Sequence, residues 1–248
     1  MSKRIALVTG GTGGIGSAIC RHLHDMGATV IAGYNHGGHD EKARGWQAEN
    51  KAEGYTFKIS YGDVSNFESM QAMVESIEKE VGPIDILVNN AGITRDNSLK
   101  KMKPSEWEAV ININLNSAFN LTRNVIGGMI ERGFGRIVSI SSINGQKGQF
   151  GQTNYSAAKA GLYGFSKALA LEVAKKGITV NTVSPGYVAT EMVTKVPKDI
   201  LDKIIAEIPV GRLASPDEIA RTVAFLAADD AGMITGANIA VNGGHHMY

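Results

Sequence analysis

Short apolar runs alternate along the chain with longer stretches of helical periodicity. Seven runs predict β-strands, at 5–8, 30–32, 55–60, 84–88, 136–140, 179–183 and 238–241. Most are nearly continuous in apolar residues, which is typical of strands covered on both faces of a sheet. Because helical patterns separate most of them, we expect parallel strands joined by right-handed crossovers. The pattern therefore predicts an α/β fold with a doubly wound parallel sheet.

Polar residues beside these runs predict where helices begin. Ser65, Ser105 and Ser215 each precede a glutamate by three residues, which is the spacing of a capping box. Pro216 suits a first helical position. One long helical pattern covers 153–176, between the fifth and sixth strands.

Composition narrows the class of protein. The chain has 248 residues, of which 43% are hydrophobic, so it can bury a large core. No linker, repeat or low-complexity segment divides it, and we expect one domain over 1–248. A net charge of +1 gives no electrostatic footprint for nucleic acid or a membrane surface.

The cysteine and histidine content and the hydropathy of the chain exclude further classes of protein. Cys20 is the single cysteine, so no intramolecular disulfide can form. No run of 18 apolar residues and no long apolar leader occurs, and we expect a cytoplasmic protein. The histidine pairs lack carboxylate or cysteine partners at ligand spacing, so we expect no metal site. These pairs are His36 with His39 and His245 with His246.

A glycine-rich segment, 9–16 (TGGTGGIG), follows the first strand and should open a helix near Gly14. Glycines allow backbone N–H groups to approach a pyrophosphate closely, and a helix N-terminus attracts its charge. Two overlapping spacings fit a dinucleotide fingerprint here, and no Gly-Lys-Ser/Thr follows to make a P-loop. The expected cofactor contacts are Gly10, Thr12, Gly13, Gly14, Ile15 and Gly16.

The end of the second strand bears on the choice of cofactor. NAD sites usually place Asp or Glu there, whereas this chain has no carboxylate until Asp40. Tyr34 lies at this strand end, and Lys42 and Arg44 follow, where they could pair with a 2′-phosphate. We therefore predict NADP(H). The alternative for the two bases is that they are ordinary exposed helix charges.

Two further loops should contact the cofactor. Asp63, after the third strand, could accept a hydrogen bond from the adenine amino group, or could only start the next helix. The expected contacts in these loops are Gly62, Asp63 and Val64, and then Asn90, Ala91 and Gly92.

Tyr155 and Lys159 stand four residues apart, on one face of the long helix. A tyrosine has a pKa of about 10, and bringing it near 7 takes roughly 4 kcal/mol. A nearby ammonium can supply that preference, which makes Tyr155 a candidate general acid. The pair could also simply coat a helix. Its place at the carboxyl end of the fifth strand, where ligands bind in α/β sheets, favours the functional interpretation.

These motifs together resemble the short-chain dehydrogenase/reductases. The residues that carry the resemblance are Thr9, Gly10, Gly14 and Gly16, the segment 89–92, Ser142, Tyr155, Lys159, Pro185 and Gly186. The match runs along essentially the whole chain. It implies a Rossmann fold with strand order 3-2-1-4-5-6-7 and assembly as a homotetramer.

The resemblance also implies roles for individual side chains. Tyr155 corresponds to the proton donor and Ser142 to the residue that hydrogen-bonds the substrate carbonyl oxygen. Lys159 corresponds to the residue that holds the nicotinamide ribose and lowers the tyrosine pKa. Asn114 corresponds to the asparagine that anchors a water in a proton relay. The segment that holds the nicotinamide carboxamide and the diphosphate corresponds to Pro185, Gly186, Val188 and Thr190.

Within this family, the segments 141–155 and 242–248 resemble the acetoacetyl-CoA reductases of polyhydroxybutyrate synthesis. The resemblance implies NADPH-dependent reduction of acetoacetyl-CoA to (R)-3-hydroxybutyryl-CoA. Two alternatives stand beside it: a 3-oxoacyl-[acyl-carrier-protein] reductase, and a catalytically silent nucleotide-binding regulator. Two positions depart from the patterns of relatives. Leu171 stands where carrier-protein reductases often have an arginine. Gly13 stands where many NADPH-using relatives have an arginine.

We expect the substrate side of the cleft to be lined by Asp96, Gln149, Phe150, Gln152 and Tyr187, with a mobile lid at about 190–210. Amides can hydrogen-bond a thioester or acetoacetyl oxygen, and aromatic rings can wall a small acyl chain. The alternative for these residues is loop packing or, for Asp96, turn formation.

Overall fold

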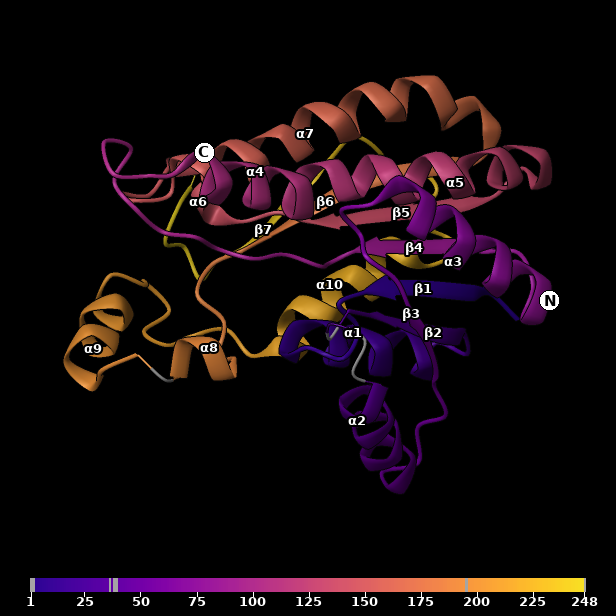
Figure 1. Cartoon of the computed structure of the whole chain (residues 1–248), viewed down its shortest axis with the longest axis horizontal. Helices are drawn as coiled ribbons and strands as arrows, with labels where there is room; N and C mark the ends of the chain where they lie inside the picture. The colour runs from indigo at the N-terminus through magenta and orange to yellow at the C-terminus, as the bar shows by residue number, and fades with distance from the viewer. Residues whose placement is uncertain (1–2, 36, 38–39, 195, 248) are drawn as a thin grey trace.

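The computed structural model describes residues 3–35, 37, 40–194 and 196–247, and His36 and His39 lie outside this part of the chain. Within it, parallel strands form one central sheet in the order β3-β2-β1-β4-β5-β6-β7 (Figure 1). The predicted fold class and strand order are confirmed. The strands are β1 (Ile5–Thr9), β2 (Thr29–Tyr34), β3 (Lys58–Tyr61), β4 (Ile86–Asn89), β5 (Gly135–Ile140), β6 (Ile178–Pro185) and β7 (Asn238–Val241).

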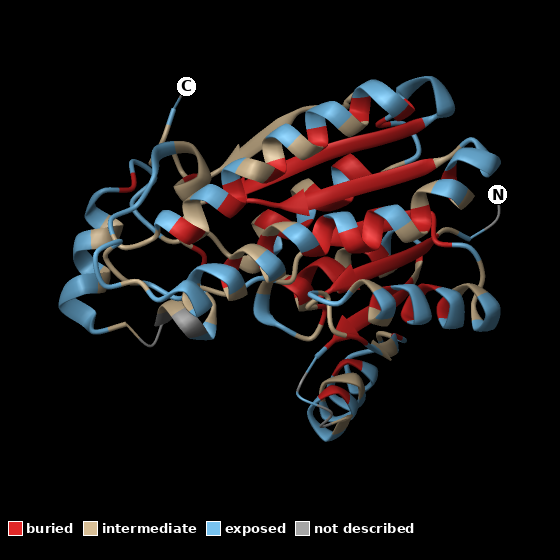
Figure 2. Cartoon of the chain, turned by 45° about the horizontal axis from the view of Figure 1, so that its top comes forward, coloured by how far each residue is buried: buried red, intermediate tan, exposed pale blue. Residues whose placement is uncertain are grey.

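Two apolar layers enclose the sheet. Helices α1 (Gly14–Asp25) and α10 (Pro216–Ala227) cover one face, and α3 (Phe67–Glu80), α5 (Ser117–Arg132) and α7 (Thr153–Val173) cover the other. Alternate strand residues supply the two layers: in β1, Ala6 and Val8 join the first core and Leu7 the second. Figure 2 shows the inner strands as the most buried part of the molecule, whereas the edge strands β3 and β7 are only partly buried. This explains the continuous apolar runs in the sequence.

Shorter elements complete the fold. They are α2 (Asp40–Ala52), α4 (Pro104–Ile111), the π-turn η1 (Asn112–Asn116), α6 (Ile143–Lys147), the 3₁₀ turn η2 (Ala174–Lys176), α8 (Glu191–Thr194) and α9 (Lys198–Ala206). The predicted helix over 153–176 is α7 followed by η2, whereas α6 was not predicted. Helices α8 and α9 lie apart from the sheet, at the left of Figure 1, in the segment predicted as a lid. None of the described helices is long and apolar enough to cross a membrane.

The third strand begins later than the sequence suggests. The prediction started at Tyr55, but β3 starts at Lys58. The residues before it form an aromatic stack instead: the ring of Tyr55 lies 5.7 Å from that of Phe57, which lies 5.1 Å from that of Trp46 on α2. Packing against the helix therefore takes these residues out of the strand.

One of the three predicted capping boxes is present. The Ser215 hydroxyl accepts from the Glu218 backbone N–H at 3.2 Å, and the Glu218 carboxylate accepts from the Ser215 N–H at 2.8 Å. The box at Ser105 is wrong, because the N-cap of α4 is Lys103, two residues earlier, and the helix begins at Pro104. There Glu106 accepts from the Lys103 N–H at 2.7 Å.

The predicted box at Ser65 is also wrong. Asn66 caps α3, and its side-chain oxygen accepts from the Ser69 N–H at 2.6 Å. Ser65 instead donates both its N–H and its hydroxyl to Asp63, at 2.9 and 2.7 Å. The aspartate two residues upstream holds Ser65 in a turn, so the next residue is left to cap the helix.

Candidate active site

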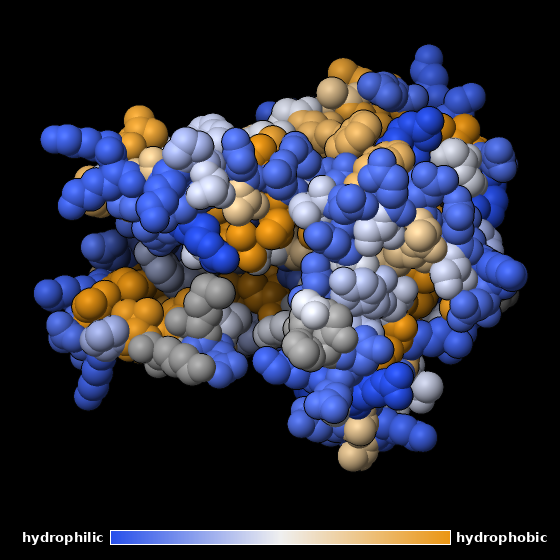
Figure 3. Space-filling model, viewed as in Figure 1, coloured by the Kyte–Doolittle hydropathy of each residue, from blue (hydrophilic) through white to orange (hydrophobic). Residues whose placement is uncertain are grey.

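A cleft of about 760 Å³ opens where the carboxyl ends of β1, β4, β5 and β6 meet the α8 segment. Figure 3 shows the surface hollowed between the lobe at the left and the rest of the molecule, with apolar side chains inside. Because parallel strands end at one edge, segments far apart in the sequence come together there.

The glycine loop is built by close approaches that side chains would block. A Cβ on Gly16 would lie 2.1 Å from the carbonyl oxygen of Gly10, and one on Gly11 would lie 2.8 Å from the Cα of Ala32. Gly10 itself has φ +59°. With α1 beginning at Gly14, the loop presents a helix N-terminus to the cleft. All six predicted contacts, from Gly10 to Gly16, line it.

Asn90 ties two loops of the cofactor end together. Its side-chain NH₂ donates to the carbonyl oxygens of Thr9 and Gly10, at 2.9 and 3.2 Å. The Thr9 hydroxyl in turn accepts from the N–H groups of Asn90 and Ala91, both at 3.0 Å. Asn90, Ala91 and Gly92 all line the cleft, so the loop after β4 fixes the glycine loop as well as bordering the cofactor end.

The end of β2 differs from the prediction. Tyr34 lines the cleft, but its hydroxyl donates to the Asp40 carboxylate at 2.5 Å, so a carboxylate does lie at this strand end. Burial and this bond raise the pKa of Tyr34 to about 12. Arg44 lies 3.9 Å from Asp40 and is exposed, as is Lys42, and neither lines the cleft. The structure therefore does not bring the two predicted bases to the site.

The residues after β3 that were predicted to contact the cofactor, Gly62, Asp63 and Val64, all line the cleft. One carboxylate oxygen of Asp63 accepts both hydrogen bonds from Ser65. Asp63 thus forms the turn before α3, the alternative considered for it, while it also faces the cleft.

Ser142 and Tyr155 form a hydrogen-bonded pair in the wall of the cleft. Ser142 caps α6, where its hydroxyl oxygen accepts from the Asn144 N–H at 3.1 Å. The hydroxyl proton is therefore left to donate to the Tyr155 oxygen. Burial raises the pKa of Tyr155 to about 12, and Asp96 and Tyr163 add to the rise, while the Ser142 hydrogen bond opposes it.

Lys159 does not lower the pKa of Tyr155 in the protein alone, contrary to the prediction. Its ammonium donates to the Ile140 carbonyl at 2.8 Å and lies 5.4 Å from the centre of the Tyr155 ring. Lys159 is buried, and burial lowers its own pKa to about 8. Burial is thus the largest cause of the shift in the pKa of each group.

Asn114 lies in the π-turn between α4 and α5. Its NH₂ donates to the carbonyls of Ile93 and Val110, at 2.8 and 2.9 Å. Its carbonyl oxygen is buried and has no partner among the described residues. A Cβ on Gly92 would lie 2.7 Å from this oxygen and 3.5 Å from the Lys159 ammonium, so both atoms face the same small space.

The predicted substrate residues divide into two groups. Gln152 and Tyr187 line the cleft, and Gln152 donates to Asp96 at 2.8 Å. Phe150 is 90% exposed and Gln149 is exposed too, and neither lines the cleft, so the predicted lining is wrong for them. Both lie in a loop that the turn at Gly148 and Gly151, with φ +73° and +81°, carries outward.

The sequence did not predict two residues that lie beside Gln152 and Tyr187. Asn144 lines the cleft and donates to the Gln152 side chain at 2.9 Å. His245 stacks on Tyr187, with ring centres 5.8 Å apart. Asn144 could have been found from its place two residues after Ser142, whereas no local signal marks His245. The residues predicted to hold the nicotinamide carboxamide and the diphosphate also line the cleft; they are Pro185, Gly186, Val188 and Thr190.

Sequence similarity covers nearly the whole chain. Residues 10–246 match the family described as Enoyl-(Acyl carrier protein) reductase. This chain is a short-chain dehydrogenase/reductase. It is therefore an oxidoreductase, and its family implies a nicotinamide cofactor. The glycine loop at the start of α1 fits the diphosphate of such a group, because it presents a helix N-terminus to the cleft.

Curated relatives of this dehydrogenase/reductase match it from end to end. It is 57% identical to an acetoacetyl-CoA reductase of Allochromatium vinosum over 245 residues, 99% of both chains. It is 55% identical to an acetoacetyl-CoA reductase of Cupriavidus necator over 247 residues, 100% of both. A 3-oxoacyl-[acyl-carrier-protein] reductase of Haemophilus influenzae is 46% identical over 247 residues, also 100% of both.

Proposed function

We propose that this enzyme reduces acetoacetyl-CoA to (R)-3-hydroxybutyryl-CoA with NADPH. The observation that carries the proposal is the Ser142–Tyr155 pair, two hydroxyl donors in one cleft with a dinucleotide cradle. The acetoacetyl-CoA reductases named above support the substrate. Such an enzyme would act in polyhydroxybutyrate biosynthesis, in the cytoplasm.

The bound nicotinamide would supply a hydride to the substrate carbonyl carbon. The Ser142 hydroxyl would turn from Tyr155 to donate to the carbonyl oxygen and so orient it. Tyr155 keeps its proton at neutral pH, because its pKa is about 12. A developing alkoxide is more basic than a phenolate, so the proton passes from Tyr155 to the substrate oxygen.

Lys159 and Asn114 serve this proton donor. The ammonium of Lys159 would swing from the Ile140 carbonyl to hydrogen-bond the ribose, which brings positive charge toward the phenolate as it forms. The unpartnered oxygen of Asn114 would anchor a water beside Lys159, as the start of a path that returns a proton to Tyr155.

NADP(H) rather than NAD(H) is supported by the state of Asp40. Tyr34 and Arg44 engage this carboxylate, which reduces its repulsion of a 2′-phosphate. Lys42 and Arg44 would have to approach the phosphate from the exposed face of α2.

A homotetramer is supported by an outward face of α7. Ala157, Ala160, Gly164 and Ala168 are exposed along it, and Leu171 is 87% exposed at its far end. A face of small residues lets a second copy approach closely. Replacing Gly164 by arginine should lower the molar mass measured by light scattering, with an exposed glycine on α2, Gly45, changed to arginine as the control.

A parallel assay tests the substrate. NADPH oxidation is followed with acetoacetyl-CoA and with an acetoacetyl-carrier protein, and then repeated with NADH. We expect the CoA thioester and NADPH to give the higher kcat/KM. A preference for the carrier-protein substrate would identify the enzyme as a 3-oxoacyl-[acyl-carrier-protein] reductase. The similarity to the Haemophilus influenzae reductase supports this alternative. No turnover with either substrate, together with NADPH binding, would favour the silent regulator.

A further inference from the structure

His245, in the C-terminal tail, lies where three segments beside the cleft meet. Its ring stacks on Tyr187, which lines the cleft. Its Nε2 atom lies 3.3 Å from the Lys147 ammonium, at the end of α6, and 3.4 Å from the Glu207 carboxylate, which follows the lid helix α9. Its side chain is only 6% exposed.

The tail is held firmly enough to place this ring. Asn242 accepts from the Gly244 N–H at 3.0 Å and donates to the His246 carbonyl at 2.8 Å, which closes a tight turn. The Gly243 carbonyl accepts from the Val210 N–H, at the base of the lid, at 3.1 Å. The tail is therefore fixed to the lid base and to its own turn, and the His245 ring cannot drift away from its neighbours.

The two charged neighbours make opposite demands on the same atom. An ammonium has only protons to donate, so Lys147 needs a lone pair on Nε2. A carboxylate only accepts, so Glu207 needs a proton on Nε2. One ring nitrogen cannot meet both demands at once. When the ring proton is on Nδ1, Nε2 accepts a hydrogen bond from Lys147 on α6. When Nε2 itself carries a proton, it donates to Glu207 at the end of the lid helix.

We propose that His245 is a positioning residue for the lid, and that Lys147 and Glu207 compete for its Nε2. When Nε2 bonds Glu207, the end of α9 is held against the His245 ring and the cleft is closed. When it serves Lys147, α6 is held and the lid is released. The inference rests on the proposed ketone reduction only for its kinetic test, because lid opening can be measured without any turnover.

The competition predicts opposite effects of two variants. Lys147→Met leaves Nε2 to Glu207, so we expect KM for acetoacetyl-CoA to fall about threefold to tenfold, the net effect of one ordinary hydrogen bond. Glu207→Ala leaves Nε2 to Lys147, so we expect KM to rise by a similar factor. Asp199→Asn is the matched control, since it removes a negative charge from the first turn of the same helix.

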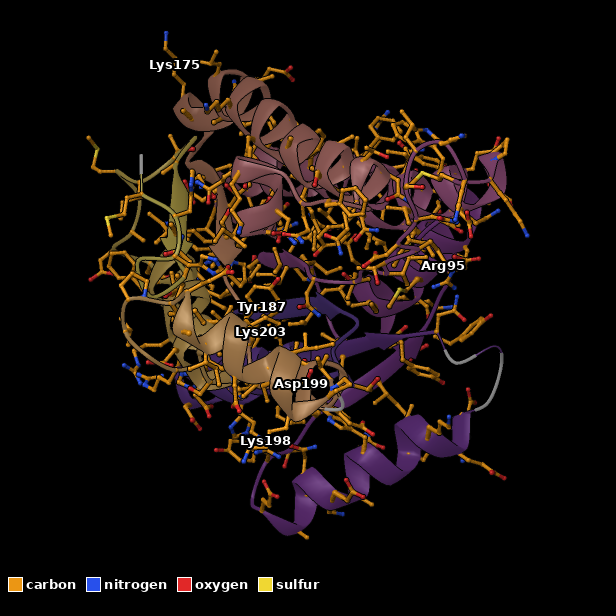
Figure 4. All side chains as sticks on the ribbon, turned by 90° about the vertical axis from the view of Figure 1, so that its left-hand side faces the viewer. Arg95, Lys175, Tyr187, Lys198, Asp199 and Lys203 are labelled. Carbon is orange, nitrogen blue, oxygen red and sulfur yellow. The ribbon has the colours of Figure 1, made fainter. Side chains whose placement is uncertain are left out.

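Trypsin cleavage after Lys203 reports lid opening directly, because this lysine is exposed in α9, on the side of the molecule that Figure 4 shows with Tyr187. Fragment masses should show slower cleavage in Lys147→Met, faster cleavage in Glu207→Ala and no change in Asp199→Asn. His245→Leu should remove both effects. His245→Gln should restore slow cleavage, because an amide carries separate donor and acceptor atoms.

Two results would overturn the proposal. One is that Lys147→Met and Glu207→Ala shift cleavage in the same direction, as a merely structural cluster would. The other is that both effects persist in the His245→Leu background. If cleavage follows the expected pattern but acetoacetyl-CoA is not reduced, the proposed substrate fails and the lid inference stands.

Discussion

Replacing Tyr155 by phenylalanine separates its chemistry from its packing. The ring stays buried and only the hydroxyl group is lost, together with its hydrogen bond to Ser142. General acid catalysis contributes about 10²–10⁴ in rate, which corresponds to roughly 3–5 kcal/mol of transition-state stabilisation. We therefore expect kcat for acetoacetyl-CoA to fall by that factor while NADPH binding, measured by fluorescence titration, stays within about twofold.

The same helix offers a matched control. The Tyr163 hydroxyl, two turns further on, donates to the Ser142 carbonyl at 2.9 Å and lies 2.9 Å from the Ser184 hydroxyl. Tyr163→Phe should cost about 1–2 kcal/mol of folding stability and leave kcat within about threefold. Tyr155→Phe with more than a tenth of wild-type turnover, or an equal loss in both variants, would refute the role of Tyr155 as proton donor.

Alkaline pH gives an independent check on Tyr155. Its folded-state pKa of about 12 lies above the ordinary value of 10.0, so it contributes stability that is complete below pH 10. That contribution, about 3 kcal/mol for two pKa units, is lost as the pH rises from about 10 to about 12. Tyr155→Phe should therefore flatten the fall in unfolding free energy over this window, as measured by urea titration.

Three further changes test other parts of the site. Lys159→Met should abolish turnover yet raise the unfolding free energy at pH 7 by up to about 3 kcal/mol, because the folded pKa is about 8 against an ordinary 10.5. That gain should shrink as pH rises from about 8 to 10.5, where the lysine becomes neutral in both states, and an unchanged gain in urea titrations would contradict it. Gly16→Ala places a Cβ against the Gly10 carbonyl and should weaken NADPH binding more than tenfold in calorimetry, whereas Gly45→Ala, with open space around it, should not. Asp40→Asn removes a carboxylate from the end of β2 and should lower KM for NADPH about twofold to fivefold, with little effect on NADH kinetics; a rise in KM for NADPH would count against the NADP(H) assignment.

The features that local sequence could predict are those fixed by local physics. The buried strands follow from their apolar runs, and the loop from Gly10 to Gly16 follows from backbone approaches that admit no side chain. The order of the strands came from resemblance to a family. Ser142 and Tyr155 were recognisable because both lie next to the carboxyl end of a strand and belong to a spaced motif.

The features that the sequence did not predict depend on which of two possible hydrogen-bond partners a side chain binds in the folded protein. Asp40 reaches back six residues to Tyr34, so the strand end gains a carboxylate that a count along the strand cannot see. Ser65 loses its capping role because Asp63 binds it first. Lys159 turns to the Ile140 carbonyl, so its effect on Tyr155 could not be read from a spacing of four. In each case two local rules compete, and only the folded geometry decides between them.

The π-turn at Asn112–Asn116 makes the active site depend on the number of residues as well as on their kinds. A π-turn accommodates one residue more than an α-helical turn does. Deleting one residue here would allow 104–131 to run as a regular helix, and each residue of an α-helix advances by about 100° around its axis. The Asn114 amide would then turn away from Ile93, Gly92 and Lys159, although no residue that touches them had been substituted. The rotation of Asn114 about the helix axis thus depends on the number of residues between α4 and α5. We therefore expect a single-residue insertion or deletion there to alter the function of the site.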